Sequence, residues 1–307
     1  MSTPKPRIGI TLGDCAGIGP EIVELALKSG RIPDSTEFVV LGRQPNCKHG
    51  VPTPETARAA AAALEEAATL ARRGELDGIV TGPVHKARMY EVGFRFPGQT
   101  EFFAERCGVK NFAMCLTSKE LTVALVTAHI PLRKVPRMLK QSEIVRVGLL
   151  LAEFLSRRSS TKAAGANPAI HALRVAVAGL NPHAGESGKL GVEEIEIIGP
   201  AIEELNSSPV TRHLSLSFTG PVSPDTVFNR AIEGEFDAVL CMYHDQGLIP
   251  LKLHAFHSGV NVTLGLPFPR TSPDHGTAFE IAGKDVARPD SMIAAMNLAA
   301  ELAAKKL

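Results

Sequence analysis

The sequence predicts an α/β fold, and two observations support this prediction. Short β-branched apolar runs alternate with helical patterns along the 307 residues, as in proteins whose helices cover a largely parallel sheet. The apolar runs are nearly continuous instead of alternating with polar residues, which is typical of strands buried on both faces. A chain of this length can form one large domain or two of ordinary size.

Six strands are expected along the chain. They are the apolar runs at residues 7–13, 38–42, 77–82, 121–128, 173–180 and 237–243. The motif GDCAGIGPE follows the first strand and opens a helix. Thr53 and Pro54 then predict the start of an alanine-rich helix that runs to Gly74, because a capping threonine before proline suits a helix N-terminus.

Four more helices are expected in the second part of the chain. Their patterns cover residues 133–158, 192–206, 224–234 and 290–306. Pro200 should kink or interrupt the second of these, because proline cannot donate the backbone hydrogen bond of a helix interior. Residues 159–169 are small and polar, and we expect a surface loop there.

Composition excludes several classes of function. A formal net charge of +1 gives no electrostatic reason to expect nucleic acid or an anionic membrane as a partner. The five cysteines form no CxxC pair, which argues against a disulfide framework and a zinc ribbon. The N-terminus lacks the pattern of a signal peptide, and no apolar run approaches the roughly 20 residues of a membrane span. We therefore expect a reduced, cytoplasmic protein.

Four apolar runs end in a histidine within a few residues. These are His85, His129, His183 and His244, and parallel α/β sheets bind ligands beyond the carboxyl ends of their strands. Histidines delivered there from separate strands can converge, and three imidazoles with open positions describe a catalytic divalent-metal site. The alternative for any one of them is a hydrogen-bonded loop residue. Asp245, directly after His244, is a further polar group at that edge.

Two other stretches are candidate binding segments. GDCAGIGPE (13–21) looks like a phosphate loop but fits neither the G-x-G-x-x-G nor the Walker pattern, so a glycine-rich strand-to-helix turn is an equal interpretation. Residues 259–279 read as a loop punctuated by glycine and proline that carries many hydrogen-bonding groups, among them Asn261 and Arg270. Arg270 and Lys252 could pair with an anionic group of a substrate.

Eight blocks along nearly the whole chain resemble the 4-hydroxythreonine-4-phosphate dehydrogenase family of pyridoxal phosphate biosynthesis. In this sequence they read GDCAGIGPE, TGPVHK, AHIPLR, GLNPHAGE, GPVSPDTVF, YHDQGLIPLK, GVNVTLGLPF and RTSPDHGTAF. The resemblance implies a fold like that of the isocitrate and isopropylmalate dehydrogenases, an α/β/α sandwich of two domains with the active site in the cleft between them. The expected borders place residues 1–98 and 276–307 in the first domain and 99–275 in the second.

The resemblance also implies cofactors and site residues. The expected protein is a homodimer that uses NAD or NADP and a divalent metal such as Zn, Mg or Co. The family's metal ligands match His129, His183 and His244, and the two subunits of the dimer share this ligand set. His85 is not among the ligands. The substrate-contacting positions match Gln99, Thr100, Lys252, Asn261 and Arg270.

The implied reaction follows a simple chemical logic. The hydroxyl carbon of 4-phosphohydroxy-L-threonine gives hydride to the nicotinamide, and the resulting 3-keto acid loses carbon dioxide to leave 3-amino-2-oxopropyl phosphate. A divalent metal acts as a Lewis acid on the reacting oxygen. Lys252 or Asp245 is the candidate base for the hydroxyl proton.

The sequence departs from the family pattern at three places. Gln99 stands where the family has a substrate-contacting histidine; it can donate a hydrogen bond but cannot carry positive charge. Cys15 stands where proline is common. The segment between LGRQPNCKHG and TPETARAA is shorter by roughly a strand and a helix.

Gln99 therefore leaves a second substrate class open, the 4-phosphorylated sugar acids D-threonate and D-erythronate. A dihydrodiol of terephthalate fits less well, because Lys252, Asn261 and Arg270 suit a phosphorylated hydroxy acid. Two other classes of function also remain as alternatives. One is a metal-dependent hydrolase or lyase without nicotinamide, and the other is a non-catalytic metal- or anion-binding module.

Overall fold

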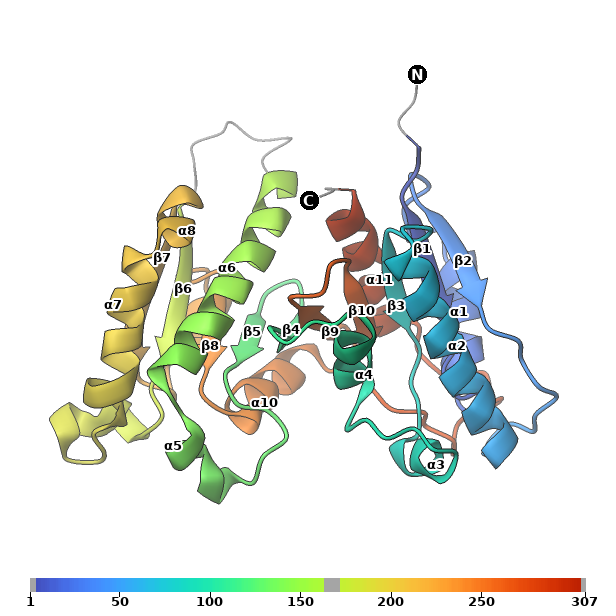
Figure 1. The fold of residues 1–307 in the computed structure, drawn as a ribbon, viewed down its shortest axis with the longest axis horizontal. Coiled ribbons are helices and arrows are strands. Elements are labelled where there is room, and N and C mark those ends of the chain that lie inside the picture. Colours follow the sequence, from blue (N-terminus) through green and yellow to red (C-terminus); the bar gives the residue numbers. More distant parts are fainter. Residues whose placement is uncertain (1–3, 163–171, 305–307) are drawn as a thin grey trace. The chain divides into compact units, whose positions relative to one another are not determined.

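The computed structural model describes residues 4–162 and 172–304 and divides into two compact units (Figure 1). Unit 1 comprises Met1–Lys110 and His257–Leu307, so both ends of the chain belong to it. Unit 2 comprises Asn111–Phe256. Each unit is an assembly of strands and helices, as the alternation along the sequence predicts.

The strands of unit 1 place the carboxyl ends of four parallel segments on one edge. Their order is β2 (Glu37–Leu41), β1 (Arg7–Thr11), β3 (Gly78–Thr81), β10 (Arg270–Pro273) and β9 (Val260–Leu264). The first four run parallel to their neighbours, and β9 is antiparallel to β10. Ile8, Ile10 and Ile79 are fully buried, which is why these strands read as continuous apolar runs.

Helices cover the strands of unit 1. They are α1 (Gly19–Lys28), α2 (Pro54–Arg72), α3 (Lys86–Glu91), α4 (Gln99–Arg106) and α11 (Asp290–Ala303). Thr53 caps α2 as predicted: its hydroxyl accepts from the backbone N–H of Thr56, and the Thr56 hydroxyl accepts from the N–H of Thr53. The C-terminal helix α11 packs on β3, β9 and β10, so the end of the chain completes the core of the first unit.

The strands of unit 2 bring three of the strand-end histidines to one edge. Their order is β4 (Ala113–Thr117), β5 (Thr122–Leu125), β8 (Ala238–Cys241), β6 (Leu173–Ala178) and β7 (Leu216–Val222). From β5 to β7 neighbouring strands are parallel, and β4 is antiparallel to β5. The carboxyl ends of β5, β8 and β6 are therefore adjacent.

The helical segments of unit 2 follow the strands. They are η1 (Leu132–Lys134), α5 (Val135–Met138), α6 (Gln141–Lys162), η3 (Pro182–Gly188), η4 (Glu194–Ile198), α7 (Gly199–Ser207), α8 (Pro209–His213), α9 (Val227–Ile232) and α10 (His244–Ala255). The segment η4 is a single π-helical turn, a form that often marks a functional position.

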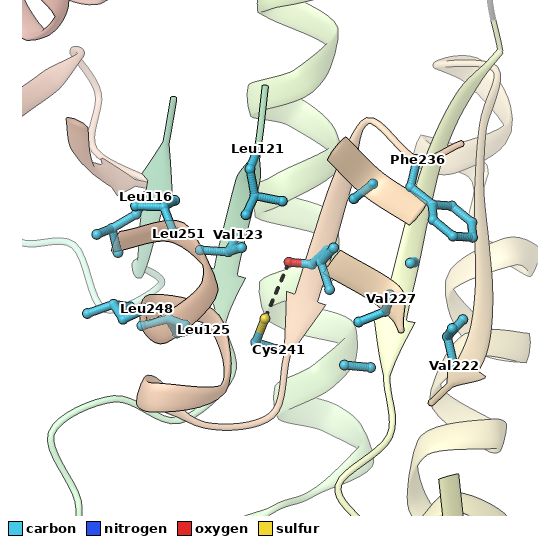
Figure 2. Close-up of a cluster of buried hydrophobic side chains, with 14 residues drawn as sticks. Leu116, Leu121, Val123, Leu125, Val222, Val227, Phe236, Cys241, Leu248 and Leu251 are labelled. Carbon is cyan, nitrogen blue, oxygen red and sulfur yellow. Dashed lines mark hydrogen bonds between the residues drawn. The ribbon is translucent and has the colours of Figure 1, made fainter. Parts of the chain in front are cut away.

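A cluster of buried apolar side chains anchors α10 to the strands of unit 2 (Figure 2). Leu248 and Leu251 of α10 pack with Val123 and Leu125 of β5. Cys241 belongs to the same cluster; burial raises the pKa of its thiol, which donates to the carbonyl oxygen of Val239 at 3.8 Å. The anchored helix starts at His244, so this core fixes the position of that histidine.

All six predicted strands are confirmed, as are the alanine-rich helix and the C-terminal helix. Pro200 interrupts the helix expected at 192–206, because it lies in the first turn of α7 after the π-helical turn η4. The expected helix at 224–234 is the shorter α9.

Two predictions were wrong, and a third, the loop at 159–169, was wrong for its first residues. The single helix expected at 133–158 is broken, because Leu139 is extended between α5 and α6. The stretch 259–279 is not a loop throughout: it contains β9 and β10, whose ladder overrides the glycine and proline signals around them.

The loop expected at 159–169 is described only in part. Residues 159–162 continue α6, and the remainder lies outside the described residues. In the described part of the chain, no helix combines the length and apolarity that a bilayer crossing requires.

Candidate active site

Three of the four strand-end histidines lie in unit 2. His129 follows β5, His183 follows β6, and His244 is the first residue of α10 after β8. The imidazole rings of His129 and His244 have centroids 5.5 Å apart and are tilted by 43° to each other. The structure therefore brings two of the three predicted metal ligands side by side.

The spacing of this pair suits two imidazoles that share one metal ion. With metal–nitrogen bonds of about 2.0–2.1 Å, two ring centroids around a tetrahedral ion lie roughly 5 Å apart. Nδ1 of His244 lies 2.7 Å from a carboxylate oxygen of Asp245, so the other ring nitrogen would face a ligand. Carboxylates that orient a ligating histidine in this way are common partners of metal sites.

His183 stands apart from the other two histidines. It is exposed in a turn after β6. The Asp225 carboxylate accepts a hydrogen bond from Ser223, which lowers its pKa, and the nearby charge of His183 contributes a smaller lowering. Among residues 4–162 and 172–304, no group of three His, Cys, Asp or Glu side chains is close enough to hold a metal. Within one chain the structure thus assembles a pair of the predicted ligands.

Four of the five predicted substrate-contacting residues lie in unit 1, around a buried guanidinium. Arg270, only 3% exposed, donates to the Thr81 hydroxyl at 2.5 Å, to the Gln99 side-chain oxygen at 2.9 Å and to the Thr263 hydroxyl at 3.4 Å. Burial lowers the pKa of Arg270 to about 10, while the charge of Glu101 acts in the opposite direction. The guanidinium nevertheless stays charged at neutral pH.

Gln99 and Thr100 begin helix α4 and join this cluster. Gln99 accepts from Arg270 and donates to the carbonyl oxygen of Gly82 at 3.1 Å. The hydroxyls of Thr100 and Thr263 lie 3.2 Å apart. The glutamine that replaces the expected histidine is therefore fixed on both sides, because its amide can accept from the charged guanidinium and donate to the carbonyl.

Some polar atoms of unit 1 are buried without a hydrogen-bond partner in the described part of the chain. Among them are Nε of Arg270 and Oδ1 of Asn261. An unsatisfied buried polar atom costs about 1–3 kcal/mol, and such atoms often belong to a binding site. Nε of Arg270 is a donor that can bind an anionic group, and Oδ1 of Asn261 is an acceptor that can bind a hydroxyl or amino group of the same ligand.

Lys252 lies on α10 in unit 2, eight residues after His244. At 1.5 Å per residue the two backbone positions are separated by roughly 12 Å along the helix axis. Asp245 is adjacent to His244, with its side chain 69% exposed. Asp245 therefore contacts His244 directly, whereas the backbone of Lys252 lies roughly two helical turns further along α10.

The glycine-rich stretch 13–21 is a packed strand-to-helix turn. Four backbone amides of a possible phosphate cradle already donate to protein oxygens: those of Asp14, Ala16, Gly17 and Ile18. A Cβ on Gly17 would lie 2.6 Å from the carbonyl oxygen of Thr277. The glycines thus permit close packing of the backbone, which supports the structural interpretation of this motif over the phosphate loop.

His85, the fourth strand-end histidine, caps a helix. Its ring nitrogen accepts from the backbone N–H of Arg88 at 3.4 Å, at the start of α3, and its ring lies 5.5 Å from that of Phe279. The capping role is a sufficient reason for a histidine at this position after β3, and no metal is needed to explain it.

Several residues of the candidate site could not be found from the sequence. Thr81 and Thr263 contact Arg270 but resemble ordinary strand threonines. Gln246 is only 6% exposed and joins two strand ends, and the buried carboxylate of Glu194 holds the turn that carries His183. Gln246 lies within the block YHDQGLIPLK, which was the available signal for it, whereas Glu194 lies outside the eight blocks.

Comparison with known proteins gives a consistent result. Residues 21–299 match the family model described as pyridoxal phosphate biosynthetic protein PdxA. A protein named 4-hydroxythreonine-4-phosphate dehydrogenase from Caulobacter vibrioides is 40% identical, with 99% of each chain covered. One of that name from Aquifex aeolicus is 41% identical, with 96% of this chain and 98% of the relative covered.

Solved structures agree with the sequence matches. A 4-hydroxythreonine-4-phosphate dehydrogenase from Klebsiella pneumoniae superposes with a TM-score of 0.76 at 34% identity, covering 97% of this chain and 100% of the other. A β-decarboxylating dehydrogenase from Thermococcus kodakarensis, with a TM-score of 0.51 at 16% identity over 95% of this chain and 81% of the other, shares the fold alone. The fold is thus of the isocitrate/isopropylmalate dehydrogenase type, and the chain belongs to the PdxA family of pyridoxal phosphate biosynthetic proteins.

Proposed function

We propose that this protein is a dehydrogenase that oxidises 4-phosphohydroxy-L-threonine with NAD or NADP. The product is the 3-keto acid, which decarboxylates to 3-amino-2-oxopropyl phosphate. The observation that carries the proposal is the shared name of relatives about 40% identical over nearly their full length. The site residues discussed below support it with independent chemistry.

His129, His183 and His244 are the proposed ligands of a divalent metal. The His129–His244 ring spacing and the Asp245 carboxylate on His244 support this assignment. When bound, the metal supplies Lewis acidity toward the oxygen on the reacting carbon. Asp245 orients the His244 ring and is exposed enough to exchange a proton with solvent.

Arg270 is the proposed partner of an anionic group of the substrate, with Gln99, Thr100 and Asn261 as further contacts. Its guanidinium is charged, buried and held in place by three side chains, so little freedom is lost when a ligand binds. The unpartnered Nε of Arg270 and Oδ1 of Asn261 add one donor and one acceptor. A planar guanidinium suits carboxylate and phosphate groups.

Asp245 and Lys252 are the proposed candidates for the base that takes the hydroxyl proton. Asp245 is adjacent to His244 in its own chain. Lys252 lies two helical turns further along, so its action at the same metal would come from a second chain. We propose such an arrangement, a homodimer whose subunits share the metal site.

The surface of α10 supports the homodimer. Ile249 and Leu253, four residues apart on one helical face, are 65% and 88% exposed. Exposed apolar pairs on a helix that also carries a metal ligand suit an interface next to the site. A second copy of this chain would bury these side chains and bring its own histidines close to α10.

The nicotinamide dinucleotide is proposed from the family relationship. The turn at residues 13–18 is not its phosphate cradle, because the amides of Asp14, Ala16, Gly17 and Ile18 already have partners. The relatives about 40% identical are named for the threonine derivative, which favours it as the substrate.

The decisive experiment measures formation of reduced nicotinamide from 4-phosphohydroxy-L-threonine, D-erythronate 4-phosphate and D-threonate 4-phosphate. Each substrate is tested with NAD and NADP, after chelation and after addition of Zn²⁺, Mg²⁺ or Co²⁺. Metal-dependent turnover of the threonine derivative is the expected result. The variant His244→Gln should lose it, and the exposed control His213→Gln should not. Preference for a sugar acid, or full activity of the chelated protein, would contradict the proposal.

A further inference from the structure

The turn that carries His183 has an unusual backbone. Five consecutive residues from His183 to Ser187 have φ between 45° and 80°, and only Gly185 among them is a glycine. For other residues the left-handed conformation costs about 1–2 kcal/mol each. Such strain persists only where the surrounding structure enforces it, and it is concentrated at functional sites.

One buried carboxylate holds the base of this turn. Glu194, 3% exposed, accepts hydrogen bonds from the backbone N–H groups of Leu180 and Asn181, each at 2.7 Å, and from the Asn181 side-chain amide at 3.0 Å. All three partners are donors, so the position requires a group that only accepts. An ionised carboxylate meets this requirement and a neutral amide does not.

Glu194 also fits the turn sterically. A Cβ on Gly185 would come within 2.6 Å of a carboxylate oxygen of Glu194, so the carboxylate lies against the left-handed backbone itself. Glu194 begins the π-helical turn η4. An inserted residue of this kind changes the direction of the side chains next to it, here at the residue that grips the turn.

The base of the turn is also tied to the helix of the second histidine. Gln246 on α10 donates to the carbonyl oxygen of Gly179 at 2.6 Å and accepts from the backbone N–H of Met242 at 2.6 Å. The N–H of Gly179 donates to Val222 at 2.8 Å. With Glu194 on one side and Gln246 on the other, the chain from β6 enters the turn in a fixed direction.

We propose that Glu194 is the positioning residue of His183: by holding Leu180 and Asn181, it imposes the left-handed turn that presents the imidazole for metal binding. The proposal rests on the metal site of the proposed function. Glu194 acts through the backbone and does not itself contact the metal. Its effect is to reduce the reorganisation that metal binding would otherwise require.

The test compares Glu194→Gln with Glu196→Gln, which makes the same chemical change at an exposed position of the same π-helical turn. Binding of Co²⁺ to the metal-free, full-length protein is measured by titration calorimetry and by the visible spectrum of the bound ion. Glu194→Gln should weaken Co²⁺ binding by about 10- to 100-fold, and Glu196→Gln should match the wild type. Saturating Co²⁺ should restore most of the turnover of Glu194→Gln, as expected of a residue that acts through the metal.

The outcomes separate this inference from the proposed function. If the wild type binds no Co²⁺, the metal site itself is wrong. If the wild type binds Co²⁺ and Glu194→Gln binds it equally well with the same spectrum, Glu194 has no positioning role. Should Glu194→Gln fail to fold, Asn181→Ala removes the side-chain bonds to Glu193 and Glu194 and keeps the two backbone bonds to Glu194; a several-fold weaker Co²⁺ affinity is then expected, and unchanged affinity would overturn the inference.

Discussion

Replacing Arg270 by methionine should separate binding from folding. The guanidinium is buried, and burial lowers its pKa from 12.5 to about 10. Each pKa unit corresponds to about 1.4 kcal/mol. The lowered pKa therefore means that keeping the Arg270 side chain charged costs the folded state about 3 kcal/mol. Methionine removes that cost together with three hydrogen bonds of the charged guanidinium, of which the one to Thr263 is long at 3.4 Å. The two shorter bonds are worth about 1.5–3 kcal/mol each, so we expect the free energy of unfolding to fall by no more than about 3 kcal/mol.

The effect of Arg270→Met on catalysis should be large. A charged hydrogen bond to a substrate anion is worth about 1.5–3 kcal/mol, so kcat/KM should fall roughly 10- to 150-fold for one such bond and further for two. Arg106→Met is the control, because Arg106 pairs with Glu65 and lies over the Phe102 ring, outside the proposed substrate contacts. It should retain the activity of the wild type.

Urea denaturation and steady-state kinetics on the same preparations provide the test. The pH dependence of the unfolding free energy is a further check, because the direction of its change can be predicted. The unfolded state holds the Arg270 proton more tightly than the folded state, so the stability of the wild type relative to Arg270→Met should rise as pH increases above about 10. A loss of more than about 3 kcal/mol in unfolding free energy, with kcat/KM unchanged in the remaining folded protein, would refute the reasoning and make Arg270 a structural residue.

Three further predictions concern the other site residues. Lys252→Ala and Asp245→Asn should each lower kcat, and near-normal turnover of both would exclude both as the base. His85→Ala should lose about 0.5–1 kcal/mol of unfolding free energy with the cap of α3, while its Co²⁺ affinity stays that of the wild type; a tenfold weaker affinity would assign His85 to the metal site. Gln99→His should change kcat/KM for 4-phosphohydroxy-L-threonine by less than tenfold, because Arg270 supplies the charge; a change of a hundredfold or more in steady-state assays would make residue 99 a specificity determinant.

Local sequence patterns predicted the fold where burial determines the structure. The runs that became β1, β3, β5, β6 and β8 are apolar because both of their faces are covered. β9 and β10 were missed because prolines and glycines surround them, and their pairing comes from distant parts of the chain. Helix α10 was missed because it starts with His244 and contains Pro250, and what holds it is the core formed by Leu248 and Leu251.

The candidate site was predictable in part for a similar reason. Strand ends gave the positions of His129 and His244, because parallel topology brings neighbouring carboxyl ends together. No local signal predicts that His183 lies in a left-handed turn, since alanine, glutamate and serine rarely adopt that conformation. The burial of Glu194 was equally hidden, because a glutamate is expected on the surface unless its partners are known.

The left-handed turn at His183 has a consequence for how the protein moves. Its strain favours opening, and the hydrogen bonds that oppose it converge on Glu194. Losing one of these bonds leaves the others misaligned, so we expect the segment to open in a single cooperative step and not by gradual fraying. In hydrogen exchange the amides of Leu180 and Asn181 should therefore share one opening rate, and that rate would limit how quickly the closed, metal-ready turn can form or be lost.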